Sequence, residues 1–271
     1  MTILFYFWIN GTESYTSSPT TKEHYDIIIS INVHEKLNFL LKQLQNIKEH
    51  VSCTYVIILN CNAYMFEECT HSKERNKLPD YVYINKDVIE KKRFHGSLVH
   101  GIYSNLKYAN EHFDFDYFIA ISSRNIFNNQ MTMGDLNRIV VPATRREELD
   151  KNKDTDYTGW QWPTMIHCLL AKYFLERNQD LYVCAHEGLL LTRVGCNHIL
   201  TFLESNVEIR EDLFDVGGCA EEFALQSISF NMGEPFYYVG KEWNNHPDNE
   251  IFLHKINRDG LLTKRSFLTF I

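Results

Sequence analysis

The sequence contains no CxxC pair and no group of Cys and His residues at the spacing of a zinc site. Its seven cysteines are scattered, and their odd number argues against a complete disulfide framework, so we expect reduced thiols in a cytosol-like compartment. Long apolar runs are also absent. The start, MTILFYFWINGTES, is too short to span a membrane and lacks the basic region of a signal peptide. These absences predict a soluble or cytoplasmic protein with no transmembrane segment.

Positive charge is in deficit, because 27 Lys and Arg residues face 35 Asp and Glu residues, for a formal net charge of -8. This balance argues against nucleic acid or an anionic membrane as a partner, although a local basic pocket could still bind phosphates. We find no internal repeat, low-complexity tract or interdomain linker in the 271 residues. A chain of this length with 44% hydrophobic residues has enough apolar material for one large domain.

Continuous apolar runs alternate with amphipathic segments along the chain. The runs YDIIISINVH, TYVIILNC and DYFIAIS are typical of strands that are buried on both faces. The segments EKLNFLLKQLQNIKEHV and SLVHGIYSNLKYANEHF have the apolar spacing of helices. This alternation predicts an α/β fold with a mostly parallel, doubly wound central sheet flanked by helices.

Polar residues follow three of the predicted strands at the point where each strand ends, at 32–34, 60–62 and 122–125. Ligands of open α/β sheets bind beyond the carboxyl ends of the strands. We therefore expect these polar ends to converge on one crevice. Asn60 could bond uracil or ribose there, or cap a turn, and His34 could be a ligand or a structural histidine.

In their order, these segments resemble the core-2/I-branching N-acetylglucosaminyltransferases and the related peptide O-xylosyltransferases. The matching stretches, across roughly 26–267, are IIISINVHEKLNFLLKQLQNI, VIILNCN, FHGSLVHGIYSNLKYA, FDYFIAISSRNIF, EGLLLTRVGCNHIL, CAEEFALQSI and EWNNHPDNEIFLHKINRDGLLTKRSF. The resemblance implies a single GT-A (Rossmann-like) glycosyltransferase domain over 1–271, with a nucleotide-binding half at about 24–130 and an acceptor and catalytic half at about 131–271. It also implies an inverting hexosyl- or pentosyltransferase that uses a nucleotide-diphosphate sugar, expected to be a UDP-sugar, and a glycan acceptor.

Most GT-A enzymes place an Asp-x-Asp motif after the strand that corresponds to DYFIAIS, where it holds Mn²⁺ on the donor diphosphate. Here that place reads Ser122-Ser123-Arg124-Asn125, and the triplet DFD at 114–116 precedes the strand. The resembled family also lacks a working motif and neutralises the diphosphate with basic side chains. We therefore expect no metal and no other cofactor. A Mn²⁺ site with ligands from elsewhere, such as Asp114 or Asp116, is the alternative.

Direct displacement needs a carboxylate that takes the proton of the acceptor hydroxyl. The pair Glu221-Glu222 is the candidate catalytic pair, and the resemblance places Glu222 at the base and Glu221 at the acidic residue before it. Neighbouring helical residues point about 100° apart, so we expect one glutamate to face the reacting carbon and the other to face solvent or cap the helix. The alternative is that both stabilise the amino end of a helix through its dipole.

Donor binding without a metal requires cations beside the diphosphate. The candidates for nucleotide-sugar binding are His34, Asn60, His95, Gly96, Ser97, Ser122, Ser123, Arg124, Asn125, Lys241, Lys264 and Arg265. Gly96 would let the backbone approach the donor closely. Because aromatic faces stack on sugar rings, Trp160, Trp162 and Trp243 are candidates for acceptor or sugar contact. Glu187 and Gly188, in the turn before a predicted strand end, are further candidates for contact with the sugar.

The alternatives for these residues are a solvated basic tail, core tryptophans and a turn at the end of a strand. The rival to an enzyme is a catalytically silent GT-A module that binds nucleotide or sugar without transfer.

Overall fold

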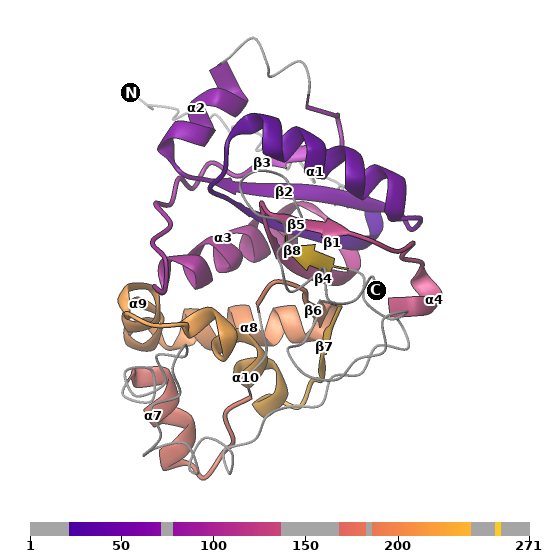
Figure 1. Cartoon of the computed structure of the whole chain (residues 1–271). Coiled ribbons are helices and arrows are strands. Elements are labelled where there is room, and N and C mark those ends of the chain that lie inside the picture. Colours follow the sequence, from indigo (N-terminus) through magenta and orange to yellow (C-terminus); the bar gives the residue numbers. More distant parts are fainter. Residues whose placement is uncertain (1–21, 72–77, 137–167, 183–185, 240–252, 256–271) are drawn as a thin grey trace, which may run out of the picture.

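The structure is a computed structural model, and it describes residues 22–71, 78–136, 168–182, 186–239 and 253–255. Along the chain (Figure 1) the elements are β1 (His24–Val33), α1 (Leu37–His50), β2 (Tyr55–Cys61), α2 (Ala63–His71), β3 (Val82–Ile84), α3 (Ser97–His112), β4 (Asp114–Ser122), β5 (Asn125–Phe127), α4 (Met133–Leu136), α7 (Leu169–Glu176), β6 (Leu189–Thr192), α8 (Arg193–Ser205), α9 (Val207–Asp215), the 3₁₀ helix η2 (Ala220–Glu222), α10 (Ala224–Asn231), β7 (Phe236–Tyr238) and β8 (Leu253–Lys255). None of the helices in these ranges is long and apolar enough to cross a membrane.

The central sheet has six strands in the order β3-β2-β1-β4-β6-β7. The first four are parallel to one another, whereas β6 is antiparallel to β4 and β7 is antiparallel to β6. The predicted α/β fold with a mostly parallel sheet flanked by helices is therefore confirmed. The reversed direction of β6 is a feature that the short run LLLT does not reveal, and it brings the amino end of β6 to the carboxyl end of β4.

Helices cover both faces of the sheet, as the alternating side chains of its strands require (Figure 1). Ile27, Ile29 and Ile31 of β1 belong to a buried cluster that includes Leu40 and Leu44 of α1. The next residues along the strand point to the opposite face, where a second cluster joins the sheet to α3, α8 and α10.

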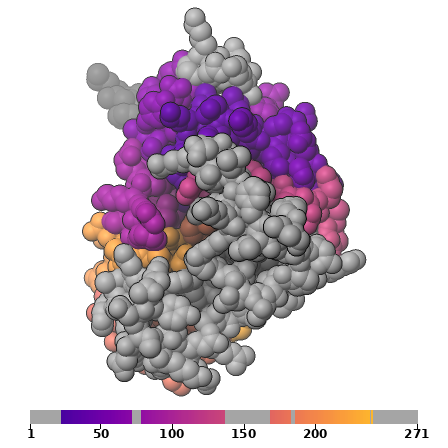
Figure 2. All heavy atoms as spheres, in the orientation of Figure 1, coloured from indigo at the N-terminus to yellow at the C-terminus, as the bar shows by residue number. Residues whose placement is uncertain are grey.

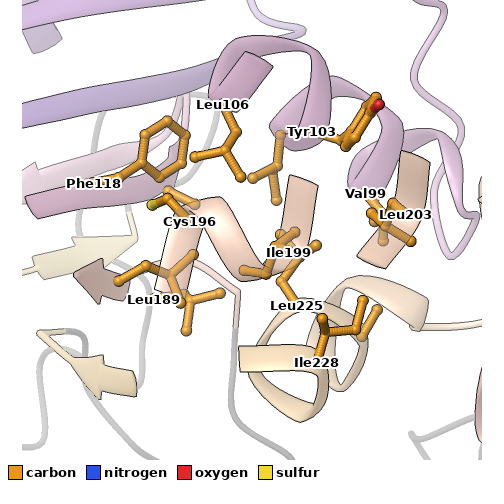
Figure 3. Close-up of a cluster of buried hydrophobic side chains, with 14 of the residues drawn as sticks. Val99, Tyr103, Leu106, Phe118, Leu189, Cys196, Ile199, Leu203, Leu225 and Ile228 are labelled. Atoms are coloured by element: carbon orange, nitrogen blue, oxygen red, sulfur yellow. The ribbon is translucent and has the colours of Figure 1, made fainter. Parts of the chain in front are cut away.

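Figure 3 shows this second cluster. Leu106 of α3 and Phe118 of β4 lie close to Cys196 and Ile199 of α8, and Leu225 of α10 lies beyond them. In the space-filling view (Figure 2) the indigo and purple atoms of the amino-terminal half lie at the top, and the visible orange atoms of the later residues lie below them. The cluster therefore joins the two halves of the chain through contacts of α3 with α8 and α9.

The loop before α3 packs directly on the end of α9. The amide of Gly96 donates to the carbonyl of Val216 at 2.8 Å, and His95 forms an antiparallel bridge with Gly217. A Cβ atom on Gly96 would lie 1.9 Å from the carbonyl oxygen of Leu213. The close approach that Gly96 allows is thus to α9 within the protein, whereas the sequence predicted an approach to the donor.

Substituting Gly96 with Ala should therefore destabilise the fold, because the new methyl group meets backbone atoms that cannot move aside. We expect the free energy of unfolding to fall by at least about 1–3 kcal/mol, as in other overpacked sites. Gly217→Ala is the matched control, since a Cβ there meets nothing within 4 Å. Its effect should stay within about 1 kcal/mol. Denaturant unfolding of both variants measures the difference, and equal stabilities would show that the loop and α9 are not packed as described.

Candidate functional site

The polar residues that end β1, β2 and β4 lie side by side at one edge of the sheet. Asn32 pairs in register with Asn60 on one side and with Ser122 on the other, so the predicted convergence is confirmed. The amino end of β6 reaches the same edge, because the amide of Gly188 donates to the carbonyl of Ala120 at 2.8 Å. We call this the carboxyl edge of the sheet.

The side chains of Ser122 and Asn125 are bonded within the turn that follows β4. Asn125 Oδ1 accepts hydrogen bonds from the amide and the hydroxyl of Ser122, at 2.7 and 2.9 Å. Gln43 of α1 donates to the carbonyls of both residues, at 2.8 and 2.7 Å. All three residues are buried. Ser122 and Asn125, which the sequence suggested for donor binding, therefore shape the turn that carries Ser123 and Arg124.

A charged group lies on that turn, formed by His34, Glu35, Ser123 and Arg124, and we call it the Glu35 cluster. Glu35 Oε1 is 3.6 Å from Arg124 Nε and 3.9 Å from His34 Nε2. The hydroxyl of Ser123 accepts from the amide of His34 at 3.2 Å. His34, Ser123 and Arg124 were predicted from the sequence and come together here. Glu35 was missed, although its place directly after the strand-ending His34 could have indicated it.

At the end of β2 the structure places a lysine that the sequence did not single out. Lys91 Nζ donates to the carbonyls of Asn60 and Ile89, each at 2.9 Å, and also to Asn60 Oδ1. The side-chain nitrogen Nδ2 of Asn60 donates to the carbonyl of Asp87 at 2.9 Å, and Asn60 is fully buried. Both ends of the Asn60 amide are thus bonded within the protein, which favours the structural alternative over contact with uracil or ribose. Lys91 was missed because it lies in the run EKKR, which is typical of solvated charge.

Burial lowers the pKa of Lys91 from 10.5 to about 8, because a low-dielectric environment disfavours the ammonium. The residue lies close under α3, where a Cβ atom on Gly101 would be 3.2 Å from Lys91 Cε. The neighbouring Glu90 acts in the opposite direction and has the smaller effect on this pKa. A lysine held in this way binds the irregular segment before α3 to the end of β2.

His95, Gly96 and Ser97 form the start of α3. The amide of Ser97 donates to His95 Nδ1 at 3.1 Å, and the Ser97 hydroxyl accepts from the amide of Lys92 at 2.9 Å. His95 Nε2 also lies 3.8 Å from an exposed carboxylate oxygen of Asp215. These contacts account for all three predicted residues as structural elements of the loop, which packs beside the Gly217 turn that leads to Glu221.

His186, Glu221 and Glu222 form a second group of charged side chains, beyond the amino end of β6. One nitrogen of His186 and one carboxylate oxygen of each glutamate lie within 4.8 Å of one another. His186 Nδ1 is 3.9 Å from Glu221 Oε1, and their side chains are only 12% and 4% exposed. We call this group the His186 cluster.

The expectation that the two glutamates point apart, with one of them facing solvent or capping the helix, is wrong. Glu221 is buried and Glu222 is half-buried, and one oxygen of each carboxylate lies within 4.8 Å of the other. The two residues lie on η2, a single 3₁₀ turn ahead of α10, and their long side chains offset the different directions of their backbones. His186 was missed, although it stands directly before the predicted Glu187.

The DFD triplet lies at the opposite edge of the sheet. His24, at the start of β1, is 3.1 Å from Asp114 and 3.7 Å from Asp116. The hydrogen bond from His24 and the charge of Arg193 lower the pKa of Asp114. Asp114 and Asp116 therefore lie at the amino ends of the strands, the end that the sequence indicated, and away from the carboxyl edge. His24, Asp26 and Asp116 offer ligand atoms within 4.8 Å of one another there, so a metal at this end stays an alternative.

Among the remaining predictions, Gly188 has a φ of 116°, in the left-handed region that favours glycine, and its carbonyl accepts from the amide of Val239 at 2.9 Å. Glu187 stands just before it at the carboxyl edge of the sheet. The other predicted residues lie outside the described ranges: Trp160, Trp162, Lys241, Trp243, Lys264 and Arg265.

Comparison with known proteins gave little. No family model matches the sequence, and no curated protein matches it. Among solved structures, the chain is similar to the apo structure of the bifunctional glycosyltransferase WbbM, with a TM-score of 0.29 and 11% sequence identity. The similarity covers 73% of this chain and 38% of that one. A likeness at this TM-score does not indicate function, so the function proposed below depends on the residues of this chain.

The lowered pKa of Lys91 makes a prediction about stability and pH. Between pH 8 and 10.5 the unfolded chain binds this proton while the folded protein has lost it, so the contribution of Lys91 to stability should rise with pH in that window. Lys91→Met removes the titrating group. The melting temperature of the wild type should therefore rise relative to that of the variant from pH 8 to 10.5, measured by scanning calorimetry. A constant or falling difference would mean that Lys91 is not buried on Asn60.

Proposed function

We propose that this chain is a glycosyltransferase that moves a sugar from a nucleotide-diphosphate sugar, a UDP-sugar, to a glycan acceptor with inversion. The observation that carries the proposal is the presence of two complementary groups at one edge of the sheet. Arg124 offers a cation at the end of β4, and the His186 cluster offers carboxylates beyond the start of β6. Direct displacement requires both a cation for the leaving diphosphate and a base for the acceptor.

The sequence resemblance supports this reading independently, because the stretches quoted above follow the order of the core-2/I-branching enzymes. In the proposed mechanism Glu222 takes the proton of the acceptor hydroxyl. The oxygen of that hydroxyl attacks the anomeric carbon from the side opposite the diphosphate. Glu221 and His186 are the charged side chains that lie beside Glu222. Arg124 donates charge-assisted hydrogen bonds to the departing phosphate oxygens, and Lys241, Lys264 and Arg265, outside the described residues, are proposed to assist it.

Exchange of the two glutamates for glutamines tests the assignment of the base. Glu222→Gln should lower the transfer rate by about 10²- to 10⁴-fold, because the amide cannot accept the proton. Its UDP affinity should be unchanged. Glu221→Gln is the matched control, since it removes the neighbouring charge and should slow transfer much less.

Transfer is measured with radiolabelled UDP-sugars and a panel of glycan acceptors, with thermal unfolding of each variant as the check on folding. Reversed effects would make Glu221 the base. If neither change slows transfer tenfold, the base lies elsewhere. A wild-type protein that binds UDP, yet neither transfers the sugar nor hydrolyses the donor, would be the silent GT-A module.

One observation favours a second candidate, a metal-dependent glycosyltransferase. The imidazole nitrogen and two carboxylate oxygens of the His186 cluster, all within 4.8 Å, fit the donor set of a divalent cation such as Mn²⁺. When bound, such an ion would neutralise phosphate charge. His186, Glu221 and Glu222 would then be its ligands, in place of the Asp114 and Asp116 considered from the sequence.

Chelation separates the two candidates. In the metal-independent enzyme that we propose, transfer should survive dialysis against EDTA with less than about a twofold change, because side-chain cations neutralise the diphosphate. Loss of activity that Mn²⁺ restores would instead establish the second candidate. In that case His186→Ala should weaken Mn²⁺ binding measured by calorimetry, while His198→Ala, on α8, should not.

A further inference from the structure

We propose that Glu35 is a positioning residue that orients the Arg124 guanidinium for binding the donor diphosphate. This inference rests on the proposed function, because it assumes that a diphosphate occupies the carboxyl edge of the sheet. Glu35 Oε1 faces Arg124 Nε at 3.6 Å. Within the described part of the chain the ion pair of Arg124 is made through Nε, and the inference assigns Nη1 and Nη2 to the ligand.

The backbone holds the two partners in place before any ligand binds. The amide of Ser123 donates to the carbonyl of Asn32 at 3.2 Å, and its hydroxyl accepts from the amide of His34. The residues just before Glu35 and just before Arg124 are therefore bonded to one another across the ends of β1 and β4. The contact follows from the parallel register of these strands and does not depend on a chance meeting of flexible side chains.

The burial of the pair is asymmetric in a way that suits this role. Glu35 is 9% exposed, while the side chain of Arg124 is 27% exposed. A carboxylate this deep is costly to bury unless a cation accompanies it. Glu35 therefore approaches the guanidinium from the buried side, and the guanidinium stays partly open to solvent.

Restraint matters for arginine because its long side chain loses rotamer entropy when it binds a ligand. A carboxylate beside Nε limits the orientations of the guanidinium beforehand, which reduces that loss, and the terminal groups form a planar pair of donors that matches two phosphate oxygens. Since Glu35 and Arg124 carry opposite charges, their sum attracts an anion weakly. Binding should therefore depend on the direction of the Nη groups, and a point charge such as lysine should not replace them.

A double-mutant cycle on the full chain, read by calorimetric titration with UDP, tests the proposal. Glu35→Asp keeps the charge but withdraws the carboxylate, and Glu35→Gln keeps the length but removes the charge. Each should raise the Kd of UDP by about three- to tenfold, the size of coupling expected between contacting residues. In an Arg124→Ala background neither should have any further effect. Arg124→Lys should bind no better than Arg124→Ala.

Glu111→Gln on the exposed end of α3 is the matched control for loss of one negative charge, and should leave the Kd unchanged. A Glu35→Gln protein that binds UDP as well as or better than the wild type would overturn the proposal, because Glu35 would then only repel the anion. An undiminished effect in the Arg124→Ala background would overturn it too, since Glu35 would not act through Arg124.

A second titration with inorganic pyrophosphate distinguishes this inference from the proposed function. If the Glu35 and Arg124 variants change the Kd of pyrophosphate as described while UDP does not bind, the inference about Arg124 holds and the proposal of a UDP-sugar donor is wrong. If the variants change the Kd of UDP as described but no sugar is transferred, the inference holds and the proposed transferase activity is wrong. If neither ligand binds the wild-type protein, the inference is overturned.

Discussion

The parallel pairing of β1 with β2 on one side and with β4 on the other is the constraint on which the rest of the structure depends. Residues 27–33 are almost completely buried, with side chains that enter a different cluster on each face. A shift of one residue in register would turn every isoleucine of the strand toward the wrong helix. The same register brings Asn32, Asn60 and Ser122 level, so the position of the candidate site follows from the packing of the core.

Buried amide and hydroxyl side chains under α3 bond the sheet to the segment before α3, which has little regular structure. Asn105 donates to the hydroxyl of Ser30 and to the carbonyl of Ile58, both at 3.0 Å. Asn85 donates in turn to Asn105 and Ser104, at 3.1 and 2.8 Å. Buried polar groups are costly unless they are bonded, so such a network favours one arrangement of the chain. It fixes the segment from which Lys91 reaches the end of β2.

Charge at the carboxyl edge is divided between two groups with opposite character. In the Glu35 cluster the acid is buried and the arginine is partly exposed, whereas the His186 cluster gathers two carboxylates around one imidazole. The reversed direction of β6 makes this arrangement possible, because it returns the chain to the end of β4 and places His186 beyond the same edge. In each group the buried acid lies beside a basic side chain, Glu35 beside Arg124 and Glu221 beside His186.

The sequence by itself determined the class of the fold, the main strands and helices, and the convergence of three strand ends, because apolar periodicity follows directly from which faces are buried. It also indicated that the DFD triplet lies at the wrong end of its strand. Only the tertiary structure decided that Asn60 bonds Lys91, that Gly96 makes room for α9, that Glu35 meets Arg124 and that both glutamates meet His186. Each of these contacts joins segments that are distant in the chain, and the contact with His186 also depends on the direction of the short strand β6. A local pattern records burial, but the partner of a polar side chain depends on how separate elements pack.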